Sequence, residues 1–424
     1  MGGKGGWSRF LQPVEAWWDA AFPLAIALLC LDQRTPAFLV LLVWLVVRLV
    51  QQLPRHPLVA VFLLLLGAQA GQFVLERDLQ PSSASDPLVI ALGLVAMLGR
   101  SALQWRTSLR WVALSIVPLA LWAAGQDPSA RLDLPIGGLN RLGFLLGILQ
   151  LAAWASIWLS RCAWTRLFYG ALTVLTIPLV LQNGSRVTLL APVCAVLLAA
   201  TGVVIRGRSE GCPAAWVGLV NWLQQRRRVL LLITAVGCAV VLQTVLSWYL
   251  DPGVAQKNVL SDRGRIDTAL CWASQPLRRG ADKALLGVGY NRSVQVRCSG
   301  KRLPAVAEAG RPEGLPHAHN LFAQVFAENG LLGLTSLAVV LGLLLWRLRL
   351  MLSGLAGWAQ AEITVLFGFP LLVYLLLNGL VSSFQIFLMS NQLLIGLGLA
   401  SFWPHPQGTA AESAGCHNDR VLSE

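Results

Sequence analysis

The stretch PHAHNLFAQVFAENGLLGLTSLAVVLGLLLWR, residues 316–347, combines the two properties that decide how this chain folds. It begins with polar residues and two histidines, and from Leu331 to Trp346 it contains no charged side chain. An apolar helix of this length crosses most of the hydrocarbon core of a bilayer, which is about 30 Å thick. The sequence therefore predicts that a long polar segment enters a membrane here.

Apolar runs of similar length recur along the whole chain. Apolar residues make up 56% of the sequence and charged residues only 12%. This composition predicts an all-α integral membrane protein with about twelve transmembrane helices. The expected spans are 16–31, 35–50, 57–75, 87–99, 110–125, 143–160, 163–182, 186–205, 229–249, 331–347, 362–379 and 383–403.

The spans divide the chain into four parts. Residues 1–249 contain spans one to nine, residues 250–330 form one large loop between spans nine and ten, and residues 331–403 contain spans ten to twelve. The tail, residues 404–424, is small and polar, and we expect it to be disordered because it has little to bury.

The basic residues predict the orientation of the spans. With both termini in the cytoplasm, inner segments hold 17 of the 33 Lys and Arg, and the short outer loops hold 5. The other 11 lie in the large loop, and long loops cross membranes largely regardless of their charge. We therefore expect a multi-pass protein of the bacterial inner membrane whose large loop is periplasmic.

The charge of the large loop indicates the kind of partner. Between residues 247 and 331 there are 11 basic and 7 acidic side chains, although topology does not require a positive balance there. Such a surface suits an anionic substrate. The net charge of +13 does not indicate nucleic acid, because the chain lacks a basic segment interleaved with aromatic residues.

Two cysteines, Cys271 and Cys298, also lie in the large loop. In an oxidising periplasm they would form a disulfide, while two free thiols are the alternative.

A polar stripe begins next to His319. Asn320, Gln324 and Glu328 follow one another at intervals of four, so they share one face of a helix. We expect Asn320 and Glu328 to support a site, with a capping or hinge charge as the other interpretation of Glu328.

His319 is the strongest candidate for proton transfer, because an imidazole with a pKa near ~6.5 is a neutral base at working pH. A structural histidine is the alternative. His317 and His319 form an H-x-H pair, but no third ligand follows at a suitable spacing, so we expect no metal.

Arg186 is the first candidate for binding phosphate. Asn183-Gly184 predicts the end of one helix and Ser185 caps the next, which puts Arg186 in a first turn. A cation is unfavourable there unless an anion binds, and helix N–H groups and a guanidinium both favour phosphate. The alternative is an arginine that extends to the membrane interface.

Arg265 is the second candidate. Arg263 and Arg265 flank a glycine, which would let the backbone approach a pyrophosphate, but Asp262 and Asp267 are equally placed to pair with them. The later segment Gly287-Val288-Gly289 is more typical of a turn than of a phosphate cradle.

These motifs together resemble the O-antigen ligase and O-antigen polymerase superfamily of membrane glycosyltransferases. The resemblance covers roughly residues 165–400 and consists of His319-Asn320 with Glu328, Gly330 and Gly333 at the family's spacing, preceded in order by Ser185-Arg186 and by Gly264-Arg265 with Gly287-Val288-Gly289. It implies that His319 is the catalytic base and that Arg186 and Arg265 bind pyrophosphate. Ala269 stands where members usually carry an aromatic residue, so Arg263 is the alternative to Arg265.

The expected function is inverting, metal-independent glycosyl transfer at the periplasmic face. The donor would be a polyprenyl-pyrophosphate-linked saccharide, and the acceptor a hydroxyl of lipid A core, another glycan or a protein. No D-x-D pair or Walker loop indicates a metal or nucleotide cofactor. Within the superfamily, ligase, polymerase and protein O-oligosaccharyltransferase remain alternatives. Outside this class, the alternatives are a solute or bicarbonate transporter and a noncatalytic component of polysaccharide export.

Overall fold

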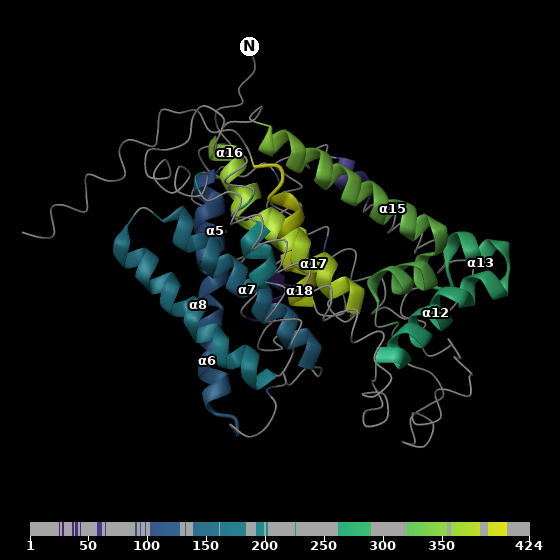
Figure 1. The fold of residues 1–424 in the computed structure, drawn as a ribbon, viewed down its shortest axis with the longest axis horizontal. Helices are drawn as coiled ribbons and strands as arrows, with labels where there is room; N and C mark the ends of the chain where they lie inside the picture. Colours follow the sequence, from purple (N-terminus) through teal and green to yellow (C-terminus); the bar gives the residue numbers. More distant parts are fainter. Residues whose placement is uncertain are drawn as a thin grey trace, which may run out of the picture.

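The computed structural model describes nine segments of the chain and a few scattered positions elsewhere. The segments are residues 57–61, 102–127, 139–160, 162–183, 192–198, 262–289, 320–353, 358–381 and 389–404. Every regular element of this described part is helical (Figure 1), and five helices are long and apolar enough to cross a membrane. The all-α class is confirmed for this described part. The count of twelve stays a prediction, because most of the first four spans and of the ninth lie outside the described residues.

The first described span consists of two helices, α5 (Ala102–Leu114) and α6 (Ile116–Ala124). They separate at Ser115 because Pro118 has no N–H to donate to the carbonyl of Leu114. The apolar helical segment runs from Gln104 to Ala124, so the helix begins before the expected span 110–125. The charge of Arg106 favoured a loop between the expected spans 87–99 and 110–125, but this side chain pairs with a carboxylate from another helix.

Helix α7 (Leu139–Leu159) lies at the centre of the bundle, where it contacts α5, α8, α17 and α18. Its leucines and alanines are almost all buried. Helix α8 (Ala163–Asn183) packs on α7 along one side and leaves Val174 and Leu181 exposed. Both helices match the expected spans 143–160 and 163–182 closely.

Helix α15 (Leu321–Leu352) has a sharp kink at Gly330, where φ is 58° and ψ is −153°. Figure 1 shows its two arms meeting at an angle beside α13. We call Leu321–Asn329 the first arm and Leu331–Leu352 the second arm. The second arm corresponds to the expected span 331–347, but it continues to Leu352 because the following residues stay apolar enough to remain helical.

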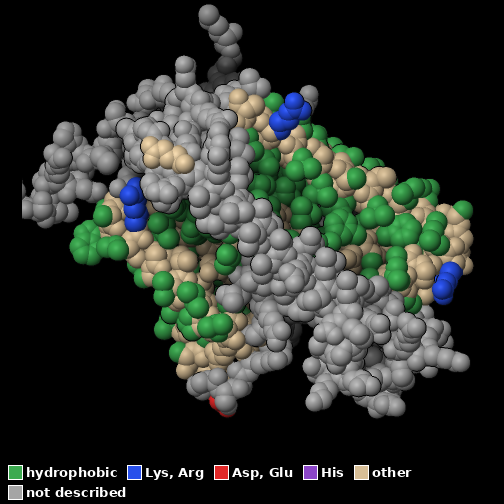
Figure 2. All heavy atoms as spheres, viewed as in Figure 1, with side chains coloured by type: hydrophobic (Ala, Val, Ile, Leu, Met, Phe, Trp, Pro, Cys, Tyr) green, Lys and Arg blue, Asp and Glu red, His purple; other side chains and the backbone are tan. Residues whose placement is uncertain are grey.

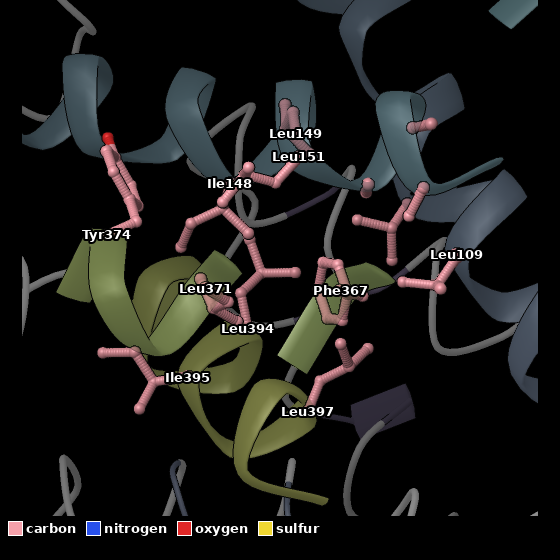
Figure 3. Packing of buried hydrophobic residues seen from close by; sticks show 14 of the residues in the cluster. Leu109, Ile148, Leu149, Leu151, Phe367, Leu371, Tyr374, Leu394, Ile395 and Leu397 are labelled. Carbon is pink, nitrogen blue, oxygen red and sulfur yellow. The ribbon is translucent and has the colours of Figure 1, made fainter. Parts of the chain in front are cut away.

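The next span comprises α16 (Trp358–Ile363), a π-helical turn η3 (Thr364–Gly368) and α17 (Phe369–Val381). Pro370 cannot donate to the carbonyl of Leu366, and a π turn is a common way to accommodate such a break. Tyr374 of α17 lies against α7 (Figure 3), where its hydroxyl donates to the carbonyls of Gly143 and Phe144. Helix α18 (Met389–Ala400) completes the bundle within the expected span 383–403.

Polar contacts between helices identify the two ends of the bundle. At the first, Arg106 pairs with Glu362, and Arg347 Nε donates to the Phe402 carbonyl at 2.9 Å. We call this the Glu362 end; α16 and the start of α5 lie together there in Figure 1.

At the other end, Asn183 Nδ2 donates to the Leu132 carbonyl at 2.9 Å, and Asn320 Nδ2 donates to the Leu380 carbonyl at 3.1 Å. We call this the Asn320 end. The predicted up-and-down order puts each of these pairs on one side of a membrane, so the observed contacts agree with that order.

The surface of the described helices is largely apolar, as Figure 2 shows. Trp164, Leu167, Val339 and Trp346 are among the exposed large side chains of α8 and α15. A contiguous apolar surface on long helices suits contact with lipid. The described part of the chain therefore forms a helical bundle of the membrane class.

Candidate functional site

The candidate site is built where α12 (Asp262–Arg279) and α13 (Ala281–Leu286) pack against the first arm of α15. These elements lie side by side in Figure 1. A small apolar cluster joins them, made of Trp272, Val288, Ala318 and Ala327. The predicted large loop thus brings α12, α13 and the start of α15 into one unit.

A glycine turn fixes α13 to the first arm. Gly287 and Gly289 have φ angles of 83° and 104°, which favour glycine. The N–H groups of Val288 and Gly289 donate to the carbonyls of Ala327 (2.8 Å) and Glu328 (3.1 Å). A helix that breaks at Gly330 leaves its last carbonyls without intrahelical partners, and this turn satisfies two of them. Because both N–H groups are taken, they are not available to a phosphate, which agrees with the interpretation as a turn.

The kink and the turn approach each other so closely that both require glycine. A Cβ on Gly287 would lie 2.2 Å from the carbonyl oxygen of Glu328, and a Cβ on Gly330 would lie 2.5 Å from the backbone nitrogen of Gly287. A Cβ on Gly333 would lie 2.5 Å from the Cβ of Asn329, across the kink. The spacing of Gly330 and Gly333 after His319 thus has a steric reason.

The polar stripe is present as expected, and its inner members are buried. Gln324 is 0% and Glu328 is 1% exposed. The Oε1 of Gln324 accepts from the Ala318 N–H at 2.8 Å, and its Nε2 donates to the carboxyl group of Glu328. Glu328 therefore orients Gln324 rather than serving as a solvated surface charge.

Asn320 begins α15. Its side-chain oxygen accepts from the Ala323 N–H at 3.0 Å, which caps the helix, and its Nδ2 donates to the Leu380 carbonyl. One side chain thus ties the start of α15 to the end of α17.

His319 and His317 lie outside the described residues, but the chain is held on both sides of His319. Gln324 binds the backbone of Ala318 immediately before it, and Asn320 immediately after it is anchored to two elements.

The arginine candidates are placed only in part. Arg186 lies outside the described residues, although α8 ends at Asn183 as expected and Asn183 is buried at the Asn320 end. Arg263 and Arg265 belong to the first turn of α12, and their side chains lie outside the described part. The helix that carries them packs against the arm that follows His319.

Sequence reasoning missed the position of Trp272. Its ring is fully buried beside Ala318, and its indole N–H has no hydrogen-bond partner within the described segments. The only sequence signal was an aromatic residue in a polar loop.

Of the two alternatives for Cys271, the structure has the disulfide. The cysteine bonded to it lies outside the described residues. The bond is covalent support for α12, the helix that carries Arg263 and Arg265.

The fold and this site define an all-helical protein of the membrane class with a polar, buried hydrogen-bond network where α12 and α13 pack against a long kinked helix. Among the described residues, no three His, Cys, Asp or Glu side chains are grouped to hold a metal ion. No protein-family model and no curated protein sequence matches the chain.

Proposed function

We propose that this protein is an inverting, metal-independent glycosyltransferase that takes a saccharide from a polyprenyl-pyrophosphate carrier and passes it to an acceptor hydroxyl. The observation that supports it best is the buried network of Gln324 and Glu328, which holds Ala318, the residue before His319. Asn320, the residue after His319, is itself anchored to α15 and α17. A solvated loop histidine needs no such support. A base that meets two substrates in a fixed geometry does.

The proposed reaction uses each candidate residue once. His319 accepts the proton of the acceptor hydroxyl, and the hydroxyl oxygen attacks the anomeric carbon. The bond from that carbon to the pyrophosphate oxygen breaks, and polyprenyl pyrophosphate leaves with the bonding electrons. Arg186 and Arg265, with Arg263 as the alternative, stabilise the negative charge on the leaving group. A single displacement inverts the anomeric centre.

The arrangement of the helix ends supports a common site for these groups. Asn183, three residues before Arg186, and Asn320, next to His319, both lie at the Asn320 end of the bundle. A lipid-anchored donor presents its pyrophosphate at the membrane surface, where both motifs would meet it. By the positive-inside rule, this is the periplasmic face of the inner membrane.

Arg186→Lys is expected to weaken donor binding by about tenfold or more, because an ammonium cannot form the two parallel bonds that a guanidinium makes with phosphate. The measurement is the affinity of the purified protein for the lipid-linked donor. Arg349→Lys, an exposed arginine near the end of α15, is the matched control and should bind normally. Unchanged affinity in both Arg186→Lys and Arg186→Ala would indicate that Arg186 does not bind the donor and instead extends to the membrane interface.

Cysteines introduced at Ala255 and Ala305 are expected to react with a membrane-impermeant thiol reagent from outside the cell. The background lacks Cys271 and Cys298, so no native thiol of the predicted large loop competes for the reagent. The native Cys416, in the tail predicted to be cytoplasmic, is the internal control and should react only after permeabilisation. The reverse labelling pattern would put His319 in the cytoplasm and remove the proposed donor.

The glycan of a deletion strain identifies the acceptor. Chains of a single repeat unit indicate a polymerase, accumulated full-length lipid-linked chains indicate a ligase, and loss of glycan from protein indicates a protein O-oligosaccharyltransferase. Solute movement without donor consumption identifies a transporter. An unchanged glycan in a strain with His319→Ala identifies a noncatalytic export component.

A further inference from the structure

A second polar cluster lies at the Glu362 end, far along the helices from the candidate site. It consists of Arg110 of α5, Ser160 at the end of α7 and Arg166 in the first turn of α8. Arg110 Nη2 donates to the hydroxyl of Ser160 at 3.3 Å, and Arg166 Nε donates to the carbonyl of the same residue at 2.9 Å. Two guanidinium groups from different helices therefore meet at one serine.

The positive charge of this cluster is not neutralised within the described part of the chain. One turn earlier on α5, Arg106 donates hydrogen bonds to the carboxylate of Glu362 from its Nε (3.1 Å) and its Nη2. Neither Arg110 nor Arg166 has such an ion pair with a described carboxylate, and the Nε of Arg110 is buried without a hydrogen-bond partner there. Two neighbouring guanidinium groups with no described carboxylate partner favour an anionic ligand beside them.

The backbone next to the cluster favours an anion as well. Helix α8 starts at Ala163, and its first N–H groups lie beside Arg166. A long helix presents free N–H groups and the positive end of its dipole at this position. The two guanidinium groups that meet at Ser160 are an independent observation that points to the same kind of ligand.

The neighbouring surface indicates that the anion carries apolar chains. Trp164 is 80%, Leu167 is 64% and Phe168 is 48% exposed, all within the first two turns of α8. Exposed tryptophan at the end of a membrane helix is typical of the interface between headgroups and acyl chains. We propose that Arg110 and Arg166 bind the phosphate of an anionic membrane phospholipid whose acyl chains lie along α8.

This inference goes beyond glycosyl transfer and does not depend on it. The topology predicted from the basic residues puts the Glu362 end in the cytoplasmic leaflet, which carries anionic lipids. The bound lipid would anchor the corner between α7 and α8 and neutralise the charge of Arg110 and Arg166.

Native mass spectrometry of the full-length protein in a neutral detergent tests the proposal. Phosphatidylglycerol, phosphatidylcholine and inorganic phosphate are added separately. The wild type is expected to retain phosphatidylglycerol at least about tenfold better than phosphatidylcholine, and the double variant Arg110→Gln, Arg166→Gln is expected to lose that preference. Arg349→Gln, which removes one exposed basic group elsewhere at the same end, is the control and should keep it.

Equal retention of phosphatidylglycerol by the double variant would overturn the assignment of these residues. Binding of inorganic phosphate with no preference between the lipids would overturn the lipid as ligand. A second measurement needs no variant: phosphatidylglycerol, but not phosphatidylcholine, should raise the thermal unfolding midpoint of the wild type as its concentration increases. A midpoint that responds equally to both lipids would contradict the proposal even if the double variant fails to fold.

Discussion

Gly330→Ala is expected to detach the glycine turn at residues 287–289 from α15 and to eliminate transfer activity. A Cβ at this position would lie 2.5 Å from the backbone of Gly287 and of Leu285, and backbone atoms cannot rotate out of the way. The backbone angles of Gly330, φ 58° and ψ −153°, lie in a region that is essentially restricted to glycine, and they add strain of about 1–3 kcal/mol for a residue with a side chain. Gly287→Ala should act in the same way, since its Cβ would meet the backbone of Glu328 from the other side.

The measurement is limited proteolysis of the purified protein. Detachment would appear as faster cleavage in the segment around α12 and α13. Gly342→Ala is the matched control, because Gly342 lies on the same helix with open space around it. That variant should be slightly stabilised, since glycine inside a helix costs roughly 0.5–1 kcal/mol relative to alanine. If Gly330→Ala is cleaved no faster than Gly342→Ala, the proposed contact between kink and turn is wrong.

His319→Ala is expected to lower the transfer rate by about 10²–10⁴-fold at normal expression, which is the usual contribution of a positioned general base. The fold should persist, because Gln324 binds the backbone of Ala318 and Asn320 caps α15 whether or not the imidazole is present. The measurement is the single-turnover rate with saturating donor. His56→Ala, a histidine in the predicted loop between spans two and three, controls for loss of any histidine. Equal rates for the two variants would remove His319 as the base.

The sequence predicted local features well. The polar stripe of Asn320, Gln324 and Glu328 follows from helical spacing alone, and the end of α8 follows from Asn183-Gly184. The spans of α7 and α8 follow from uninterrupted apolar runs. In each case the pattern lies within a few turns of one helix.

The remaining features depend on contacts between distant segments. Arg106 looked like part of a loop because its partner, Glu362, lies 256 residues further along the chain. Apolar periodicity does not predict the kink at Gly330. Glycine is required there because the backbone of residues 285–289 packs against it, and this contact is not a local feature of the sequence. Burial of Trp272 likewise depends on the packing of α12 against α15.

The most direct test of the central claim is donor turnover by the purified wild type in liposomes. The liposomes contain a polyprenyl-pyrophosphate-linked saccharide with an acceptor glycolipid, and the buffer contains EDTA. We expect release of free polyprenyl pyrophosphate in equal amount to the glycan joined to the acceptor, with inverted anomeric configuration and no need for added metal. Two results would contradict this expectation. In one, the donor stays intact until a divalent cation is added; in the other, the donor stays intact and the protein transports a solute.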